Sequence, residues 1–290
     1  MLTKRKIFVI LFLFYLAPMV FAWTLVFETS GRRLPEFEKD IAERVEAFSE
    51  KVPAVASSLD TIRIRITYTR EEFGVATRGL VPDWSIGAAN PETGTIVLYF
   101  PESSRSPQAI ELVGHELGHI LLHNAVGEGV WIPRWFDEGF AQWISGPIED
   151  GQAVRIAYAE LIGESVRLWE LESVNSWSGD RANLAYAESR AAFDFLMEIA
   201  PNSDIFALIN SLGRDRDFDI GFEAHMGISV EDFYLRWAEE RVHRFNWSLI
   251  LLDWRFIFSA ITILFLIGGT IKLVRTRRII RERDGEEIQA

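Results

Sequence analysis

Long apolar runs occupy both ends of the chain, and mixed patterns of hydrophobic and polar positions fill the stretch between them. The first run is the uncharged stretch Ile7–Phe27, and the second covers Phe256–Ile271. Between them, residues 61–69 alternate apolar and polar side chains, and Thr95–Phe100 is a second segment rich in strand-forming residues. Helical periodicity dominates the rest, which predicts a mixed fold with few strands and many helices.

The helical segments fall on both sides of these two strands. They cover residues 34–52, 107–124, 133–146, 152–167, 183–200, 203–213 and 229–245. A turn-rich segment, residues 82–91, precedes the second strand. We therefore expect an α/β (α+β) domain with a small mixed sheet on the N-terminal side and a helical C-terminal half.

The helix expected from Pro107 carries the residues with the most distinctive chemistry, the run from His115 to His119. Residues four apart lie one above the other on a helix, so His115 and His119 can present two imidazoles to one metal ion. Glu116 points about a quarter turn aside, where a carboxylate can act as general base for a metal-bound water. The polar residues of this helix exclude a membrane span.

A catalytic zinc site needs a third protein ligand and an open fourth position. Glu138 lies in the next helical segment, and eighteen residues, 120–137, separate it from His119. Pro133 and Gly146 mark the two ends of that segment.

The joint pattern is His-Glu-x-x-His, eighteen residues, and Glu within Trp-x-x-Glu-Gly-x-Ala. It resembles the gluzincin metallopeptidases, above all the aminopeptidase-N-like group and the compact peptidase-MA-like domains related to the thermolysin-type zincins. The resemblance covers about residues 62–244 and implies a zincin-like fold that acts on peptide or protein substrates. It also implies that His115, His119 and Glu138 bind one Zn²⁺ per chain and that Glu116 is the catalytic base.

Further roles follow from the same resemblance. Aminopeptidase-N-like gluzincins use a downstream tyrosine hydroxyl to stabilise the developing oxyanion, and Tyr186 is the candidate here, with Tyr158 as its rival. Either tyrosine also fits a purely structural role. Asp137 or Gln142 is expected to orient a ligand histidine, because histidines that bind zinc need such partners.

The chain departs from related families at several positions. Metzincins place a third histidine at the position of Ala125, which excludes that group, and His123 fits a polar residue at the helix end or beside the ligands. Residues 83–90 contain no Gly-x-Met-Glu-Asn segment for binding a free amine, so endopeptidase action is the default. In relatives, a strand before the zinc helix borders the cleft and can pair with substrate. Thr95–Phe100 is the candidate, with an interior strand as the alternative.

Charges beside the two apolar ends predict how the chain meets a membrane. Residues 1–22 begin with Lys4-Arg-Lys and fit a signal peptide or an uncleaved N-terminal anchor. Residues 254–274 fit a transmembrane helix, and the arginine-rich tail 275–290 is cytoplasmic by the positive-inside rule. We therefore expect a peptidase domain at residues 23–249 on the extracytoplasmic side, with the bilayer as a partner of the C-terminal helix.

The composition of the chain limits which classes of partner it can bind and indicates the kind of cell compartment it comes from. The formal net charge is −12, and the two ends hold nine of the 30 basic residues but only four of the 42 acidic ones, so the domain between them is more acidic still. Nucleic acid is therefore an unfavourable partner. The chain has no cysteine, which excludes disulfides and thiolate ligands and favours a bacterial envelope protein.

These observations predict a membrane-anchored zinc metallopeptidase, single-pass or two-pass according to the fate of its N-terminal segment. The alternative is a non-catalytic zincin-fold domain that binds or scaffolds other molecules at the membrane.

Overall fold

A computed structural model describes residues 6–10, 23–29, 31, 35–51, 59–101, 107–146 and 150–287. It divides into two compact units. The first unit comprises Met1–Gln152 and Val166–Arg241, and the second comprises Ala153–Ser165 and Val242–Ala290. The first unit contains the sheet and all the candidate ligands.

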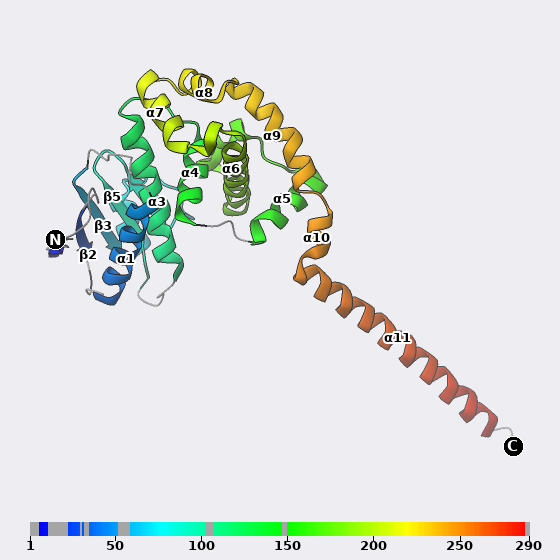
Figure 1. Cartoon of the computed structure of the whole chain (residues 1–290). Helices are drawn as coiled ribbons and strands as arrows, with labels where there is room; N and C mark the ends of the chain where they lie inside the picture. Colours follow the sequence, from blue (N-terminus) through cyan, green and yellow to red (C-terminus); the bar gives the residue numbers. More distant parts are fainter. Residues whose placement is uncertain are drawn as a thin grey trace. The chain divides into compact units, whose positions relative to one another are not determined.

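A five-stranded mixed sheet forms the N-terminal side of the first unit, with the strand order β1-β2-β3-β5-β4 (Figure 1). The strands are β1 (Lys6–Ile10), β2 (Thr24–Thr29), β3 (Thr61–Thr67), β4 (Gly87–Asn90) and β5 (Thr95–Tyr99). Strands β2, β3 and β5 are parallel, whereas β1 and β4 run antiparallel to their neighbours at the two edges. The mixed α/β fold expected from the sequence is confirmed.

The register explains which predicted strands lie in the interior. Ile62, Ile64 and Ile66 of β3 are all buried, as the alternation of that segment predicts. Strand β5 pairs with β3 on one side and with β4 on the other, so its hydrogen-bonding groups are already used. The expectation that this strand pairs with substrate is therefore wrong, and its alternative, an interior strand, is correct.

The N-terminal apolar stretch is divided between strands. Leu25 and Phe27 of β2 are buried against the core, so the last residues of this uncharged stretch belong to the sheet. Strand β1 lies within residues 1–22, and its pairing with β2 is antiparallel. The assignment of residues 1–22 as a leader or anchor stays a prediction.

Helices account for most of the remaining chain. They are α1 (Pro35–Lys51), α2 (Arg70–Ala76), α3 (Pro107–Val126), α4 (Arg134–Ser145), α5 (Asp150–Ile162), η1 (Leu168–Ser176), α6 (Gly179–Ile199), η2 (Pro201–Ser203), α7 (Ile205–Asp215), α8 (Phe218–Met226), α9 (Val230–Arg244), α10 (Ser248–Leu252) and α11 (Trp254–Glu287). Helix α3 lies between the sheet and α4, and α4 in turn packs on α6 (Figure 1).

Two glycines permit the close packing of these helices. A Cβ atom on Gly118 of α3 would lie 2.8 Å from the Ala141 Cα of α4, so this glycine lets α3 and α4 approach each other. A Cβ atom on Gly139 of α4 would lie 2.7 Å from the Ser189 carbonyl oxygen of α6. Helix α4 is thus held tightly between α3 and α6.

Aromatic side chains of α4 also pack against α9 and α6. Trp135 stacks on Phe233 of α9 with ring centroids 5.0 Å apart, and Phe136 meets Phe193 of α6 at 5.4 Å. The Trp135 indole N–H donates to the Tyr234 hydroxyl at 3.0 Å. Such close contacts restrict the rotation of α4 and therefore set the direction of its polar residues.

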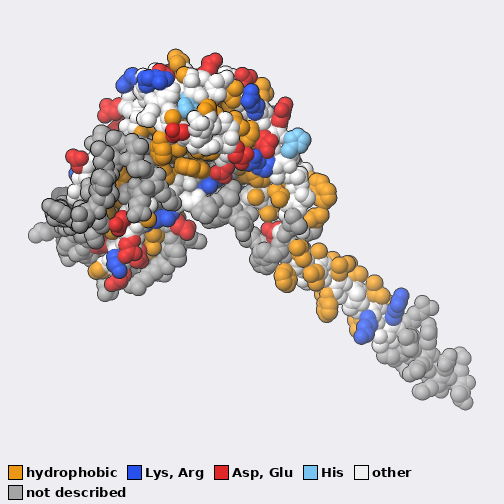
Figure 2. Space-filling model, in the orientation of Figure 1, with side chains coloured by type: hydrophobic (Ala, Val, Ile, Leu, Met, Phe, Trp, Pro, Cys, Tyr) orange, Lys and Arg blue, Asp and Glu red, His pale blue; other side chains and the backbone are white. Residues whose placement is uncertain are grey.

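The second unit contains one helix that is long and apolar enough to cross a membrane. Residues Ile257–Arg277 of α11 form this 21-residue segment, judged by length and composition among the described residues. Their apolar side chains are exposed, and basic side chains follow them toward the C-terminus (Figure 2).

Candidate metal centre

Helix α3 presents its two histidines at one point. Because they lie one turn apart, their Nε2 atoms come within 3.2 Å of each other, and the two rings are perpendicular. Val113, Leu117 and Ile120 of the same helix are fully buried, which fixes the face that carries the histidines.

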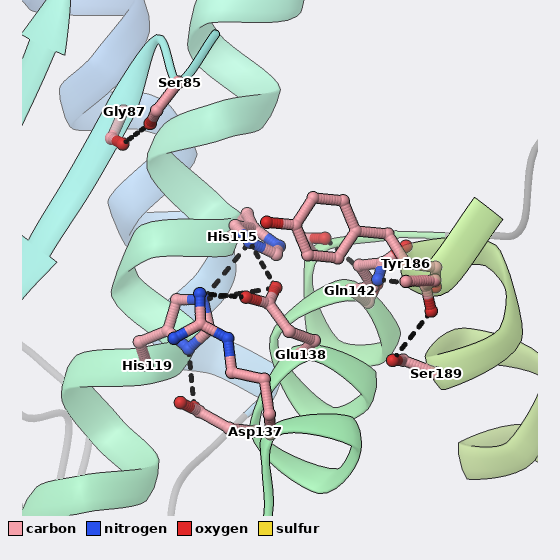
Figure 3. Close-up of polar contacts among 12 residues, drawn as sticks. Ser85, Gly87, His115, His119, Asp137, Glu138, Gln142, Tyr186 and Ser189 are labelled. Atoms are coloured by element: carbon pink, nitrogen blue, oxygen red, sulfur yellow. Dashed lines mark hydrogen bonds and ion pairs between the residues drawn. The ribbon is translucent and has the colours of Figure 1, made fainter. Parts of the chain in front are cut away.

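Helix α4 brings Glu138 to the same point. Its Oε2 atom lies 3.3 Å from the His115 Nε2 atom and 3.7 Å from the His119 Nε2 atom. The three potential ligand atoms all lie within 4.8 Å of one another, so these residues are close enough to hold a metal ion. Figure 3 shows the three side chains pointing toward one another from α3 and α4.

The chemistry of this cluster fits a zinc ion. Two imidazoles and one carboxylate are a donor set that catalytic zinc sites use. The Glu138 Oε2 atom is buried and accepts no hydrogen bond from the described residues, although buried polar oxygens are normally satisfied. A cation between the two imidazoles would satisfy it.

The other carboxylate oxygen of Glu138 is held by Arg134. The Arg134 Nη2 atom lies 2.9 Å from the Glu138 Oε1 atom, one helical turn away on α4. Burial alone would raise the pKa of Glu138, but Arg134 and then His119 outweigh it and lower the pKa to about 2. Glu138 is therefore a carboxylate at neutral pH.

Asp137 orients His119 from the side opposite the metal position. The His119 Nδ1 atom lies 2.6 Å from the Asp137 Oδ1 atom, and the His123 Nε2 atom lies 3.2 Å from Asp137 Oδ2. Burial opposes ionisation of Asp137, but the two histidines hold its pKa well below the usual range. An imidazole that donates Nδ1–H to a carboxylate directs its Nε2 lone pair toward a metal.

Gln142, the alternative orienting residue, contacts no ligand histidine among the described residues. Its side-chain amide donates instead to the Tyr186 carbonyl oxygen at 2.9 Å. Gln142 thus ties α4 to α6 and positions Tyr186 rather than the imidazoles.

Glu116 lies beside the cluster and is only 6% exposed. Burial raises the pKa of Glu116, and His115 and His119 reduce this effect. A Cβ atom on Gly87 of β4 would lie 2.6 Å from the Glu116 Oε1 atom, so the strand passes directly over this carboxylate. Only glycine leaves room for the observed carboxylate position.

Tyr186 of α6 lies at the same site. Burial raises the pKa of the Tyr186 hydroxyl, Glu138 raises it further, and the charge of Arg134 partly opposes both effects. The Trp84 ring meets the Tyr186 ring edge-on at 6.0 Å. Tyr158 belongs to the part of α5 in the second unit, and its side chain is 55% exposed.

Strand β4 is the edge strand of the sheet and lies next to this site. The Tyr99 N–H donates to the Ile86 carbonyl at 2.9 Å, so alternation along an antiparallel ladder turns the backbone groups of Gly87 and Ala89 outward. The Ser85 hydroxyl donates to the outward Gly87 carbonyl oxygen at 2.5 Å (Figure 3). Strand β4, which the sequence did not predict, therefore takes the position expected of Thr95–Phe100.

Sequence reasoning also missed Arg134 and Trp84. Arg134 precedes Glu138 by four residues, a spacing that brings side chains together on a helix, and this signal was readable. Trp84 lies in the turn-rich segment and has no periodic partner, so only the tertiary structure reveals its contact with Tyr186.

Comparison with known proteins agrees with this geometry. The model of one protein family, the peptidase MA superfamily, matches residues 62–242, which include both ligand helices and Tyr186. No curated protein matches the chain.

Proposed function

Because the chain belongs to the peptidase MA superfamily, we propose that it is a membrane-anchored zinc peptidase that cleaves internal peptide bonds. The observation that carries the proposal is the meeting of two imidazoles and a carboxylate within 4.8 Å, with a second carboxylate beside them. His115, His119 and Glu138 hold the zinc ion, and Glu116 stays off it as the general base.

Each group then has a defined task in hydrolysis. Zinc, when bound, polarises the scissile carbonyl and makes the attacking water more acidic. Glu116 takes a proton from that water and delivers it to the leaving amine. Its raised pKa, caused first by burial, suits a carboxylate that must both accept and return a proton.

Tyr186 supplies a neutral hydrogen-bond donor. Because its hydroxyl pKa is raised, mainly by burial, the proton stays on the oxygen throughout the neutral range. Such a donor stabilises the negative charge that develops on the carbonyl oxygen as water attacks.

The substrate is an extended peptide that adds to the free edge of β4. The outward backbone groups of Gly87 and Ala89 pair with a peptide main chain whatever its side chains are. An edge strand can receive the middle of a long chain, and the sequence lacks the segment that binds a free amine. Both features favour endopeptidase action.

The apolar part of α11 anchors the enzyme, with the peptidase domain outside the cytoplasm and the basic tail inside. A reporter that is active only outside the cytoplasm should be active when fused after Arg244 and inactive when fused after Gly285. The opposite pattern contradicts the proposed topology.

The catalytic proposal is tested with the full-length chain in detergent. His115→Ala, His119→Ala and Glu138→Ala should each lower bound zinc, because the loss of one ligand leaves an under-coordinated ion. Glu116→Gln should retain zinc and thermal stability but lose at least about a hundredfold in peptide hydrolysis, the scale of general-base catalysis.

The results for the wild type and these variants distinguish an enzyme from a non-catalytic binding domain. If the wild-type protein holds one zinc per chain, cleaves nothing in a diverse peptide library, and Glu116→Gln complements a deletion phenotype, the chain is a non-catalytic zincin-fold domain. If Glu138→Ala keeps full zinc affinity, the ligand assignment is wrong.

A further inference from the structure

Arg134 is the cation closest to the candidate ligands, and its position is fixed from several sides. It opens α4, and its backbone N–H donates to the Glu172 side chain of η1 at 2.9 Å. Its side chain is 34% exposed, whereas the Glu138 side chain that it contacts is 3% exposed. The guanidinium thus reaches inward from the rim of the site to a buried carboxylate.

This contact makes the two oxygens of Glu138 unequal. The Oε1 atom lies 2.9 Å from the Arg134 Nη2 atom, whereas Oε2 faces the two imidazoles and accepts no hydrogen bond from the described residues. A free carboxylate can bind zinc through one oxygen or through both. With Oε1 paired with the guanidinium at 2.9 Å, Oε2 is the oxygen left to face the metal position.

The same guanidinium also interacts with the tyrosine. The charge of Arg134 acts on the Tyr186 hydroxyl and opposes the rise in pKa that burial causes, and Tyr186 is further positioned by the Trp84 ring and by Gln142 on its backbone. Arg134 therefore connects the third ligand with the proposed oxyanion donor. A planar guanidinium with several N–H groups can serve two acceptors at once, which an ammonium group does less well.

We infer that Arg134 is a positioning residue of this site, which restricts Glu138 to one metal-binding oxygen and holds the Tyr186 hydroxyl toward the substrate carbonyl. The inference rests on the proposed function and deepens it. One oxygen instead of two from Glu138 keeps a coordination position open for water and substrate, as catalysis requires. The competing explanation is an ordinary i, i+4 ion pair that only stabilises α4.

The variants Arg134→Met and Arg134→Lys distinguish these explanations in the full-length protein. The matched control is Arg65→Met, because Arg65 forms a similar pair with Glu28, at 2.8 Å and with comparable burial of the arginine, away from the site. Each protein is loaded with Zn²⁺ or with Co²⁺, whose visible absorption is strong in four-coordinate sites and weaker in five-coordinate sites. The measurements are the metal dissociation constant, the cobalt spectrum, and kcat and KM on a peptide that the wild type cleaves.

Arg134→Met should still bind both metals, but its cobalt absorption should weaken because the second oxygen of Glu138 becomes free to join the metal. Its kcat should fall by about a hundredfold, the effect of losing one oriented oxyanion donor, with a much smaller change in KM. Arg134→Lys should lie between Arg134→Met and the wild type in both cobalt absorption and kcat. Arg65→Met should match the wild type in spectrum and kcat, whatever its stability.

Failure of the inference is distinct from failure of the proposed function. If wild type takes up no zinc or cobalt, both fail together. If wild type binds metal and cleaves peptides while Arg134→Met keeps its spectrum and kcat, only the inference is overturned. If Arg134→Met does not fold, the inference is tested with the double variant Arg134→Lys/Tyr186→Phe, whose kcat is compared with those of the two single variants. The two substitutions should lower kcat by less together than the product of their separate effects, and a full product overturns the inference.

Discussion

The closeness of Gly87 to Glu116 predicts an unusual phenotype for the substitution Gly87→Ala. The new Cβ atom would lie 2.6 Å from the Glu116 Oε1 atom and 2.8 Å from a terminal methyl of Leu112. Ordinary contact begins near 3.4 Å, so the carboxylate must move by about 0.8 Å and the methyl by about 0.6 Å. Both are the ends of flexible side chains, so the protein can adapt without unfolding.

The two effects of Gly87→Ala have different sizes. Alanine restricts the unfolded chain and gains up to about 1 kcal/mol, whereas overpacking costs about 1 to 3 kcal/mol, so the net loss of stability should stay below about 3 kcal/mol. A general base displaced by nearly 1 Å can lower turnover by about a hundredfold. We therefore expect kcat to fall ten- to a hundredfold while zinc content stays at the wild-type level.

The assay compares kcat, zinc per chain and Tm for Gly87→Ala with those of Gly74→Ala. Gly74 lies inside α2 with nothing within 4 Å of a built Cβ atom, so its alanine variant should match the wild type in kcat. Turnover of Gly87→Ala within about twofold of wild type would refute the argument. So would a loss of zinc, because the ligands are not in the predicted clash.

Two further predictions concern Tyr186 and the proposed ligand His119. Tyr186→Phe removes only a hydroxyl and should lower kcat by about ten- to a thousandfold with little change in Tm, and unchanged kcat would leave Tyr186 a structural role. For metal-free protein, burial lowers the pKa of His119, but Asp137 and then Glu138 outweigh it and raise the pKa to about 9. Zinc must then displace a proton, so chelator competition should show zinc affinity rising with pH up to about 9 and levelling above it; a flat profile contradicts this. The His119 imidazolium stabilises the metal-free fold below pH 6.5, and that contribution to stability is lost as pH rises through about 9.

Local patterns in the sequence predicted the elements whose identity depends on local spacing. The alternation of residues 61–69 marks β3, and the periodic helices 183–200 and 229–245 reappear as Gly179–Ile199 and Val230–Arg244. The two histidines meet because a helix places residues four apart on one face. These features follow from a few consecutive residues, so one sequence suffices to find them.

Features that depend on distant contacts were missed. Strand β4 has the sequence Gly-Ala-Ala-Asn, which has little intrinsic tendency to form a strand and exists by pairing with β5. Its small residues are required by the Glu116 carboxylate beneath it, which no local pattern reveals. Strand β2 was not predicted, because its first residues lie in the uncharged stretch Ile7–Phe27 and a buried strand and a membrane segment share the same composition.

The charges of the site explain why three carboxylates can lie buried in one place. Glu116, Asp137 and Glu138 are each less than 10% exposed, and buried charges must be balanced. A bound zinc ion would supply two positive charges and Arg134 supplies one, which together would balance three carboxylates. In metal-free protein, protonation of His119 replaces part of that charge, in keeping with its raised pKa. Arg134 is the part of this balance that does not depend on zinc. Its removal should therefore affect the site in both the metal-free and the zinc-bound protein.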